Sequence, residues 1–342
     1  MRITISDIAK LANVSKSAVS IVLNNKPGVS DKTRSKVLET IKKYNYSPNH
    51  IAQSLATRET KSIGLITKEI NNPYFANVMK GVYDTCSQLG YSVLLGSSEL
   101  SCEKELEIVN ALLGKRVDGL LISPLQNEDS NFAYLSNLLR DNYPLVLLGE
   151  VKNYATNSVD IDNFAAAYDA VSYLIKLGHK RIAHLAGSVH SLHGQKRLEG
   201  YKQALNDNNL AINKNYIVSV EPNIASGFNA GRQMFSKVVE LPTAVFCYND
   251  LVAIGLVNAL HQMRIPVPEK VSVIGFDNID FSQYVQIPLT TIQMPAYEIG
   301  KSATTLLIKQ IASPGDVLNE KIIMRHELIV RNSCAKYKKG RA

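Results

Sequence analysis

Apolar residues near the start of the chain recur every three or four positions, which is the spacing of short amphipathic helices. Ile8 and Leu11 predict the inward stripe of a first helix, and the pair Thr4 and Asp7 matches a capping box at its start. Ala9 lies on the same helix, where a small side chain lets a second helix approach closely. The pattern therefore predicts a short first helix that packs through one face.

A turn and a second helix follow at once. Asn13 tolerates the left-handed backbone of a tight turn, and Ser15 can cap the helix that begins after it. Val19, Val22 and Leu23 supply the face of this helix that packs on the first one. The two elements form a helix, a turn and a helix, a unit that either binds DNA or serves as a plain helical hairpin.

A third amphipathic segment completes a small bundle. Ser30 and Asp31 open it, it extends to about Tyr44, and its apolar residues face the first two helices. If the bundle binds DNA, the start of its second helix enters the major groove. The residues expected nearest the bases are Lys16, Ser17 and Ala18, with Ser20 and Ile21 alongside, and those expected at the phosphates are Asn24, Ser30 and Asn49.

From Lys61 onward, short runs rich in Val, Ile and Leu alternate with helix-length amphipathic segments, which is typical of a parallel sheet with crossover helices. The strands are expected in SIGLIT, YSVLLGSS, GLLIS and PLVLLGE, and after VDID in RIAHLAG, YIVSV, AVFCYND and VSVIGFDN. The two sets have a similar order, and the second begins near residue 163. The predicted fold is α/β, with an all-α headpiece followed by two lobes of parallel sheet flanked by helices.

Polar and aromatic side chains follow several of these strands. Ligands of open α/β sheets bind at the carboxyl ends of the strands, so we expect these side chains to meet in a cleft between the lobes. Aromatic rings can stack on a sugar or a base, while Arg, Asn and Asp orient its polar groups. The candidates are Tyr74, Phe75, Ser191, His193, Arg197, Asn249 and Asp277. Each also has a structural alternative, such as core packing for the aromatic residues.

The net charge of +8 is distributed unevenly along the 342 residues. Residues 1–61 contain 11 Lys and Arg against four acids, whereas residues 62–330 contain 22 basic and 26 acidic residues. A basic N-terminal segment on a slightly acidic body is expected of a nucleic-acid-binding protein, because basic side chains neutralise phosphates and release counterions. A merely solubilising basic surface is the alternative, and charge alone favours neither.

The sequence lacks the signals of several other classes of protein. No apolar stretch is long enough to span a bilayer, and MRITISDIAK offers no signal-peptide core, so we expect a cytoplasmic protein rather than a periplasmic sugar-binding protein. The four cysteines are scattered, and His190 and His193 have no carboxylate or cysteine nearby, so no metal site is expected. No GxSxG, P-loop or GxGxxG motif opens the first βα unit, so neither enzymatic activity nor a cofactor is expected.

Motifs along the whole chain resemble one family. DIAKLANVSKSAVSIVLN and GVSDKTRSKVLETIKKYNYSPNHIAQSLATRETKSIGLI are followed by NNPYFANVMKGV, KRVDGLLISP, VDIDN, LGHKRIAHLAG, RLEGYKQAL, CYNDLVAIG, VSVIGFDN, PLTTIQMP and RHELIVRNSC. Their joint order and spacing resemble the lactose/galactose-repressor (LacI/GalR) family of transcriptional regulators. The resemblance implies a repressor that binds a palindromic DNA operator as a homodimer and is controlled by a small-molecule effector between two periplasmic-binding-protein-like lobes.

The resemblance also implies a domain organisation and further site residues. The expected parts are a headpiece (1–47), a hinge helix and linker (48–60), an effector-binding and dimerisation domain (61–332) and a basic tail (333–342). Lobe 1 would comprise about 61–161 and 292–322, and lobe 2 about 162–291 and 323–332. Paired hinge helices at 50–56 would lie in the minor groove, with Leu55 wedged between base pairs. The site residues added in this way are Thr4, Ser15, Ile51, Ala52, Leu55 and Ala56 for DNA, and Phe228 for the effector.

Two positions depart from the family pattern, because many relatives have arginine in place of Ile21 and Gln53. Without arginine at 21 a candidate guanine reader is lost, so the operator half-site is expected to differ from the usual one. The effector is expected to be a sugar or sugar phosphate, since purine-responsive members tend to have arginine in place of Ser191. KELEIVNALLGKRVDG is reminiscent of the catabolite-control branch, whose corepressor is a phosphocarrier protein, and this alternative stays open. The tail AKYKKGRA has no leucine heptads, so no coiled-coil tetramer is expected.

Overall fold

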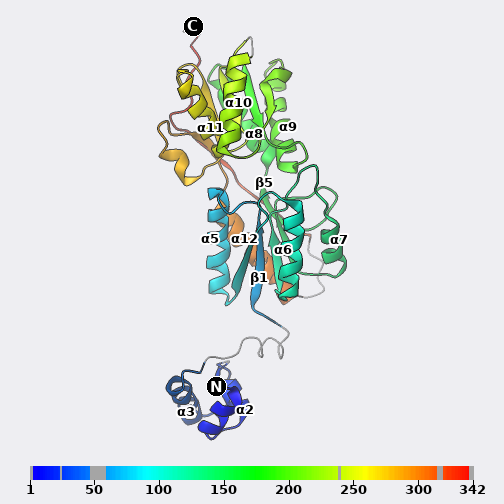
Figure 1. Ribbon diagram of the computed structural model, residues 1–342, viewed down its shortest axis with the longest axis vertical. Helices are drawn as coiled ribbons and strands as arrows, with labels where there is room; N and C mark the ends of the chain where they lie inside the picture. The colour runs from blue at the N-terminus through cyan, green and yellow to red at the C-terminus, as the bar shows by residue number, and fades with distance from the viewer. Residues whose placement is uncertain (1–2, 24, 47–58, 238–239, 314–318, 339–342) are drawn as a thin grey trace. The chain divides into compact units, whose positions relative to one another are not determined.

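The computed structural model describes residues 3–23, 25–46, 59–237, 240–313 and 319–338 (Figure 1). The chain forms two compact units, Met1–Thr60 and Lys61–Ala342. Several residues expected to contact DNA lie outside the described residues, and their assignment stays a prediction. They are Asn24, Asn49, Ile51, Ala52, Leu55 and Ala56.

The first unit contains three helices among its described residues, α1 (Ile5–Leu11), α2 (Lys16–Leu23) and α3 (Asp31–Lys43). Their shared core consists of Ile8, Ala9, Ala12, Val19, Val22 and Val37. The predicted inward stripe of α1 was wrong at Leu11, which is 47% exposed. Ala12 closes the buried face instead, because residues four apart lie on the same side of a helix and Ile8 sets that side.

The turns that shape this bundle form as the sequence predicts. The Thr4 hydroxyl accepts a hydrogen bond from the Asp7 amide (3.3 Å), and the Asp7 carboxylate accepts one from the Thr4 amide (2.9 Å). Asn13 has a φ of 49°, which is the left-handed turn between α1 and α2. The Ser15 hydroxyl accepts from the Ala18 amide at 3.1 Å and so caps α2.

The second unit begins with a parallel sheet in the strand order β11-β5-β4-β3-β1-β2, which we call lobe 1. Its strands are β1 (Ser62–Thr67), β2 (Ser92–Ser97), β3 (Gly119–Ile122), β4 (Leu145–Leu148), β5 (Asn157–Ile161) and β11 (Lys321–Met324). The helices around it are α5 (Pro73–Gln88), α6 (Cys102–Gly114), α7 (Ala133–Arg140) and α12 (Ala296–Ala312) (Figure 1).

A second sheet, lobe 2, repeats this plan in the order β12-β10-β9-β8-β6-β7, with only β12 antiparallel to its neighbour β10. Its strands are β6 (Ile182–Ala186), β7 (Ile217–Ser219), β8 (Ala244–Cys247), β9 (Ser272–Asp277), β10 (Thr290–Gln293) and β12 (Glu327–Ile329). The helices are α8 (Asn163–Lys176), α9 (Leu192–Asp207), α10 (Ile224–Lys237) and α11 (Asp250–Gln262), with short 3-10 turns η1 (Lys214–Tyr216) and η2 (Asp280–Gln283).

Each sheet is buried on both faces, which explains its continuous apolar strands. In β4, Val146 and Leu148 join a core that includes residues of α5 and α12, whereas Leu145 and Leu147 join a core with residues of α6 and α7. Successive side chains of a strand point to opposite faces, so helices must cover both. The predicted α/β architecture of two lobes with flanking helices is confirmed.

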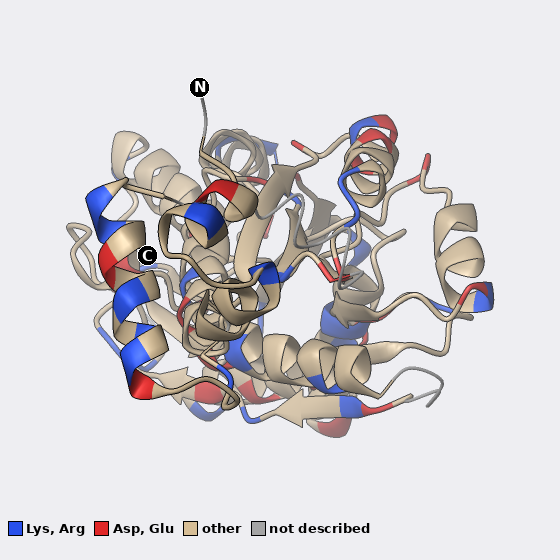
Figure 2. Cartoon of the chain, turned by 90° about the horizontal axis from the view of Figure 1, so that it is seen from below, with Lys and Arg blue, Asp and Glu red and all other residues tan. Residues whose placement is uncertain are grey.

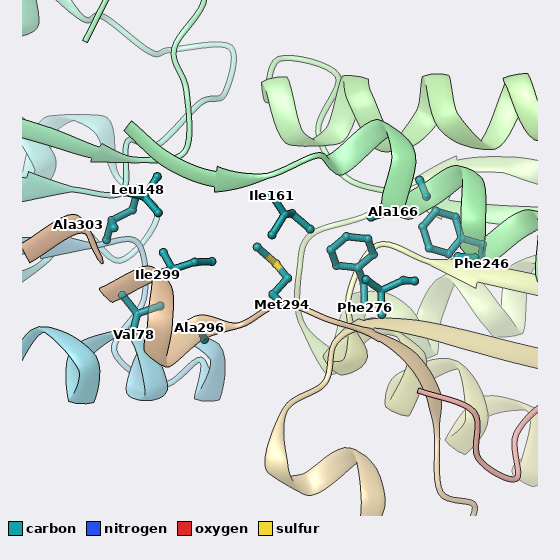
Figure 3. Packing of buried hydrophobic residues seen from close by; sticks show 14 of the residues in the cluster. Val78, Leu148, Ile161, Ala166, Phe246, Phe276, Met294, Ala296, Ile299 and Ala303 are labelled. Atoms are coloured by element: carbon teal, nitrogen blue, oxygen red, sulfur yellow. The ribbon is translucent and has the colours of Figure 1, made fainter. Parts of the chain in front are cut away.

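The chain passes between the lobes after β5, after β10 and after β11. The lobe bounds implied by the family resemblance place these crossings near 162, 291 and 323. In the structure β10 ends at Gln293, where it pairs with Asp277 of β9, and β11 ends at Met324. Figure 3 shows Ile161, Met294 and Phe276 beside one another at this junction, packed in one core. The lobes are therefore joined by buried apolar contacts as well as by three chain segments.

Candidate functional site

The start of α2 presents the side chains expected to read DNA. Lys16 and Ser17 are exposed, and Ala18, Ser20 and Ile21 are half-buried, while the opposite side of the helix carries the buried Val19 and Val22. Ser17 and Ile21 are four residues apart and so share one face of α2. This arrangement leaves one face of α2 accessible to a DNA groove.

Arg34 on α3 fixes the turn that follows α2, and the sequence analysis did not single it out. Its guanidinium donates to the Asn25 side-chain oxygen (3.0 Å) and to the Lys26 carbonyl (2.6 Å). Asn25 has a φ of 50°, so the turn needs such support. Figure 2 marks in blue the Lys and Arg residues of the part of the chain that the structure describes. Arg34 therefore acts as a positioning residue for the exposed face of α2.

Thr4 and Ser30, also expected at the DNA, both serve as helix caps. Thr4 caps α1, and the Ser30 hydroxyl accepts from the Thr33 amide at 3.3 Å. Both side chains are exposed, so capping leaves them accessible to a phosphate. Their contact with DNA stays a prediction.

A cavity of about 80 Å³ lies between the two lobes of the second unit, at the carboxyl ends of their strands. Of the predicted effector residues, it is lined by Tyr74, Phe75, His193, Arg197, Asn249 and Asp277. Sequence reasoning missed other lining residues, among them Lys68, Glu69, Asn72, Leu148, Gly149, Asp160, Tyr248 and Met294. Several of these end a strand or come directly after one, and this position in the sequence could have identified them.

Two predicted effector residues do not line this cavity. Ser191 is the N-cap of α9, and its backbone amide donates to the Ser188 carbonyl (3.2 Å). Phe228 lies on α10, which packs closely against α11 through Gly227 and Gly255. Neither residue lines the cavity as it stands, and their contact with an effector stays a prediction.

Arg197 occupies the centre of the site and is only 3% exposed. Its guanidinium lies 3.5 Å from the centre of the Phe276 ring. The Nε donates to the Asn163 side-chain oxygen (2.9 Å) and Nη1 donates to the Tyr248 carbonyl (2.5 Å). These contacts hold the cation in one orientation, so Arg197 supports the cavity wall as well as lining it.

Two carboxyl groups lie on the lobe 2 side of the site. Asp277 ends β9 with a φ of 103°, and burial raises its pKa to about 7 although Arg197 acts in the opposite direction. Behind it, the Asp250 carboxyl accepts from the Thr291 hydroxyl (2.6 Å) and the Ile279 amide (2.9 Å). Burial, with a contribution from Asp277, raises the pKa of Asp250 to about 8. Asp250 thus anchors the loop that presents Asp277 to the cavity.

Asn249 combines lining the cavity with a structural role. Its side-chain oxygen accepts from the Val252 amide (2.9 Å) and caps α11, and its side-chain nitrogen donates to the Pro222 carbonyl (3.1 Å). Asn249, and not the neighbouring Asp250, is therefore the N-cap of α11. With both ends of its amide engaged, Asn249 shapes the cavity more than it offers new donors.

The N-terminal part of α9 makes three polar contacts with lobe 1. His193 Nε2 lies 2.8 Å from Asp160 Oδ2, the Leu192 amide donates to the side-chain oxygen of Gln126 (2.9 Å), and Lys196 pairs with Glu150 (3.0 Å). Burial opposes ionisation of Asp160, yet His193 and Arg197 hold its pKa below the ordinary value. We call these three contacts the interlobe clamp, and they join α9 of lobe 2 to lobe 1 beside the cavity.

The described residues contain no group of three or more His, Cys, Asp and Glu side chains that could hold a metal ion. Within the same residues, no helix is long and apolar enough to cross a bilayer. His190, which sequence reasoning considered beside His193, donates only its backbone amide to the Ser188 hydroxyl (3.2 Å) in the contacts described. The site is thus one of polar and aromatic side chains.

Family models match both units of the chain. The model described as bacterial regulatory proteins, lacI family, matches residues 4–49, and the model described as a periplasmic binding protein-like domain matches residues 171–334. Catabolite control protein A of Priestia megaterium is 36% identical over 313 residues, 90% of this chain and 92% of the relative. The HTH-type transcriptional repressor PurR of Histophilus somni (strain 129Pt) is 36% identical over 336 residues, 96% of this chain and 98% of the relative.

Solved structures give the same picture. The Lac repressor dimer bound to operator and the anti-inducer ONPF has a TM-score of 0.88 and 28% identity, and the match covers 98% of this chain and all of that one. The complex of the transcriptional regulator CelR with cellobiose has a TM-score of 0.74 and 28% identity, covering 97% of this chain and all of that one. The similarity therefore extends over the headpiece and both lobes.

Proposed function

Because the chain belongs to the LacI family of DNA-binding transcriptional regulators, we propose that it represses transcription from a palindromic operator as a homodimer, in the cytoplasm where the DNA lies. The effector of this repressor binds in the interlobe cavity and is a sugar or a sugar phosphate. The observation that carries the proposal is the convergence of Tyr74, Arg197 and Asp277, from three separate segments, on one cavity. No catalytic role is assigned to these residues.

A sugar suits the chemistry of the cavity. The Tyr74 and Phe75 rings, which meet edge to face with centroids 5.2 Å apart, offer apolar surface for a pyranose face. Asp277, whose carboxyl has no hydrogen bond to another described side chain, can accept from hydroxyl groups. A solved relative of this fold carries cellobiose, which supports a carbohydrate as the class of effector.

The effector acts by changing the position of one lobe relative to the other. At about 80 Å³ the cavity is far below the roughly 300–1,000 Å³ of typical small-molecule sites, so a sugar requires the lobes or the lining side chains to move. A ligand shifts such an equilibrium only by its differential affinity for the two states. We therefore assign the interlobe clamp of α9 as the element whose making or breaking accompanies the response.

A phosphocarrier protein as corepressor is the alternative function. The chain is 36% identical to catabolite control protein A and 36% identical to PurR, so sequence identity alone does not place it in the catabolite-control branch. If a phosphocarrier protein tightens operator binding in the absence of any sugar, the alternative is correct.

Asp277→Asn tests the proposal. It replaces the carboxyl group that accepts from the effector by an amide of the same shape, so operator affinity should stay near the wild-type value and the response to effector should be lost. Asp280→Asn is the matched control, since Asp280 is exposed and three residues away.

The measurements are operator affinity by fluorescence anisotropy, with and without a panel of sugars, and melting temperature. An Asp277→Asn protein that responds like the Asp280→Asn control would remove Asp277 from the effector site. A lower melting temperature together with loss of operator binding would instead make Asp277 a structural residue of lobe 2.

A further inference from the structure

Lys68 lies at the carboxyl end of β1 and lines the interlobe cavity from the lobe 1 side. Its ammonium group forms no hydrogen bond and no ion pair within 4.0 Å among the described residues. Both carboxylates that influence it most are already engaged. Glu105 accepts from the Tyr134 hydroxyl (2.7 Å) and the Leu125 amide (2.8 Å), and Asp160 belongs to the interlobe clamp.

The surroundings of Lys68 make an unpaired ammonium group unfavourable. Burial lowers its pKa, and Arg197 lowers it further, while Glu105 and Asp160 act in the opposite direction. Lys68 is half-buried, and an ammonium group that loses part of its water without gaining a partner costs free energy that a counterion can restore. The position of Lys68 in the cavity wall means that a bound molecule can supply that counterion.

Arg197 is less suited to this task than Lys68. Its Nε and Nη1 already donate to Asn163 and Tyr248, and the Phe276 ring lies against one face of its guanidinium. Lys68 keeps all three of its ammonium donors for a ligand. From lobe 2, Asp277 presents a carboxyl group that repels anions and accepts from hydroxyls.

We propose that Lys68 determines effector specificity by selecting a polyhydroxylated molecule that carries an anionic group, a phosphate or a carboxylate, at its lobe 1 end. This rests on the proposed function, in which the cavity is the effector site. Hydroxyl groups of the same molecule donate to Asp277. Because Lys68 comes from lobe 1 and Asp277 from lobe 2, the ligand bridges the two lobes, and its charge helps to determine the position of one lobe relative to the other.

The test compares wild type with Lys68→Met, which preserves most of the side-chain length but removes the charge. Lys115→Met is the control, since Lys115 is an exposed lysine of the same lobe, and Lys68→Arg retains the charge. The probes are glucose, glucose 6-phosphate, glucuronate and inorganic phosphate, each at millimolar concentration. Binding is measured by calorimetry and by the shift in melting temperature.

We expect an anionic sugar to bind wild type, Lys115→Met and Lys68→Arg, and Lys68→Met to lose about tenfold or more in affinity, as expected for a charge-assisted hydrogen bond. Any affinity for glucose should change by less than about twofold. A preference for glucose 6-phosphate over glucuronate identifies phosphate as the anion, and the reverse identifies carboxylate. Without ligand, Lys68→Met should melt no lower than wild type, because no internal partner is lost.

Three results would overturn the proposal. They are equal affinities of wild type and Lys68→Met for the anionic sugars, binding of glucose alone, and failure of all three anionic probes to stabilise wild type. Failure of the Lys68 assignment can be distinguished from failure of the proposed function. If Asp277→Asn abolishes the operator response to a neutral sugar while Lys68→Met leaves it intact, the cavity is the effector site and only the assignment of Lys68 is wrong.

Discussion

Gly149 offers a way to break the interlobe clamp without touching its side chains. It follows β4 with a φ of 108°, and a Cβ placed on it would lie 2.8 Å from His193 Nε2 and 2.9 Å from His193 Cε1. Such distances are shorter than a van der Waals contact, so Gly149→Ala must displace the His193 ring. The ring would then leave Asp160, to which it is bonded at 2.8 Å.

The cost has two parts that act on different equilibria. The unfavourable φ destabilises the fold by about 1–2 kcal/mol whether the lobes are open or closed. Loss of the hydrogen bond to a charged carboxylate costs a further 1.5–3 kcal/mol, roughly, and affects only the closed form. The second part corresponds to a change of about tenfold to a hundredfold in the ratio of closed to open molecules.

Chemical denaturation measures the first part, and small-angle scattering measures the second as an increase in the radius of gyration. His193→Ala is the control that removes the hydrogen bond without straining the backbone. The double variant should open no further than either single variant, because the clash requires the ring that His193→Ala deletes. If the free energies of the two single changes add within about 0.5 kcal/mol, or if Gly149→Ala leaves the radius of gyration unchanged, the clamp does not hold the lobes closed.

The remaining predictions concern the lobe 2 core and the hinge. Burial lowers the pKa of His184, which stacks on Phe246 with centroids 4.6 Å apart, from 6.5 to about 4. Folding therefore favours the neutral ring, so the free energy of unfolding should fall by up to about 3 kcal/mol as pH decreases from 6.5 to 4. Urea titrations across this range should show a flatter dependence for His184→Gln, and equal slopes would refute the assignment. Leu55→Ala should weaken operator binding much more than non-specific binding, because a side chain wedged between base pairs stabilises only the complex with bent operator DNA. Equal DNA bending by wild type and variant, measured by energy transfer between labelled DNA ends, would exclude Leu55 as the wedge.

The sequence predicted the elements of the fold well, for a physical reason that particular residues illustrate. The apolar runs of β1, β4 and β9 are continuous because both faces of each sheet are covered, and such runs are easily recognised. Leu11 shows that the spacing of apolar residues is less informative in short helices. Over seven residues of α1, one turn of spacing does not determine which of two apolar positions faces inward, and the partner helices decide in favour of Ala12.

The site was predicted only in part, because the sequence locates strand ends but not distances across the lobes. Arg197 and Asp277 were found from their motifs, yet Asp160 in the middle of VDID was not, since its role depends on His193 from the other lobe. Lys68 was overlooked for the opposite reason. A lysine after a strand is ordinarily a solvated surface residue, and only its place in the cavity wall, where the charges of Glu105, Asp160 and Arg197 influence its pKa, reveals its exceptional surroundings.

Selection of binding sites from random DNA by the purified full-length protein, followed by anisotropy on the selected site, measures whether the protein is an effector-controlled reader of one DNA sequence. We expect enrichment of one inverted repeat, with affinity that falls steeply as salt increases and that changes when effector is added. Ile21→Arg should move the preference toward guanine at one symmetric pair of positions. Enrichment of no sequence, or binding that no sugar, sugar phosphate or phosphocarrier protein alters, would contradict the account of a regulator whose cavity controls its headpiece.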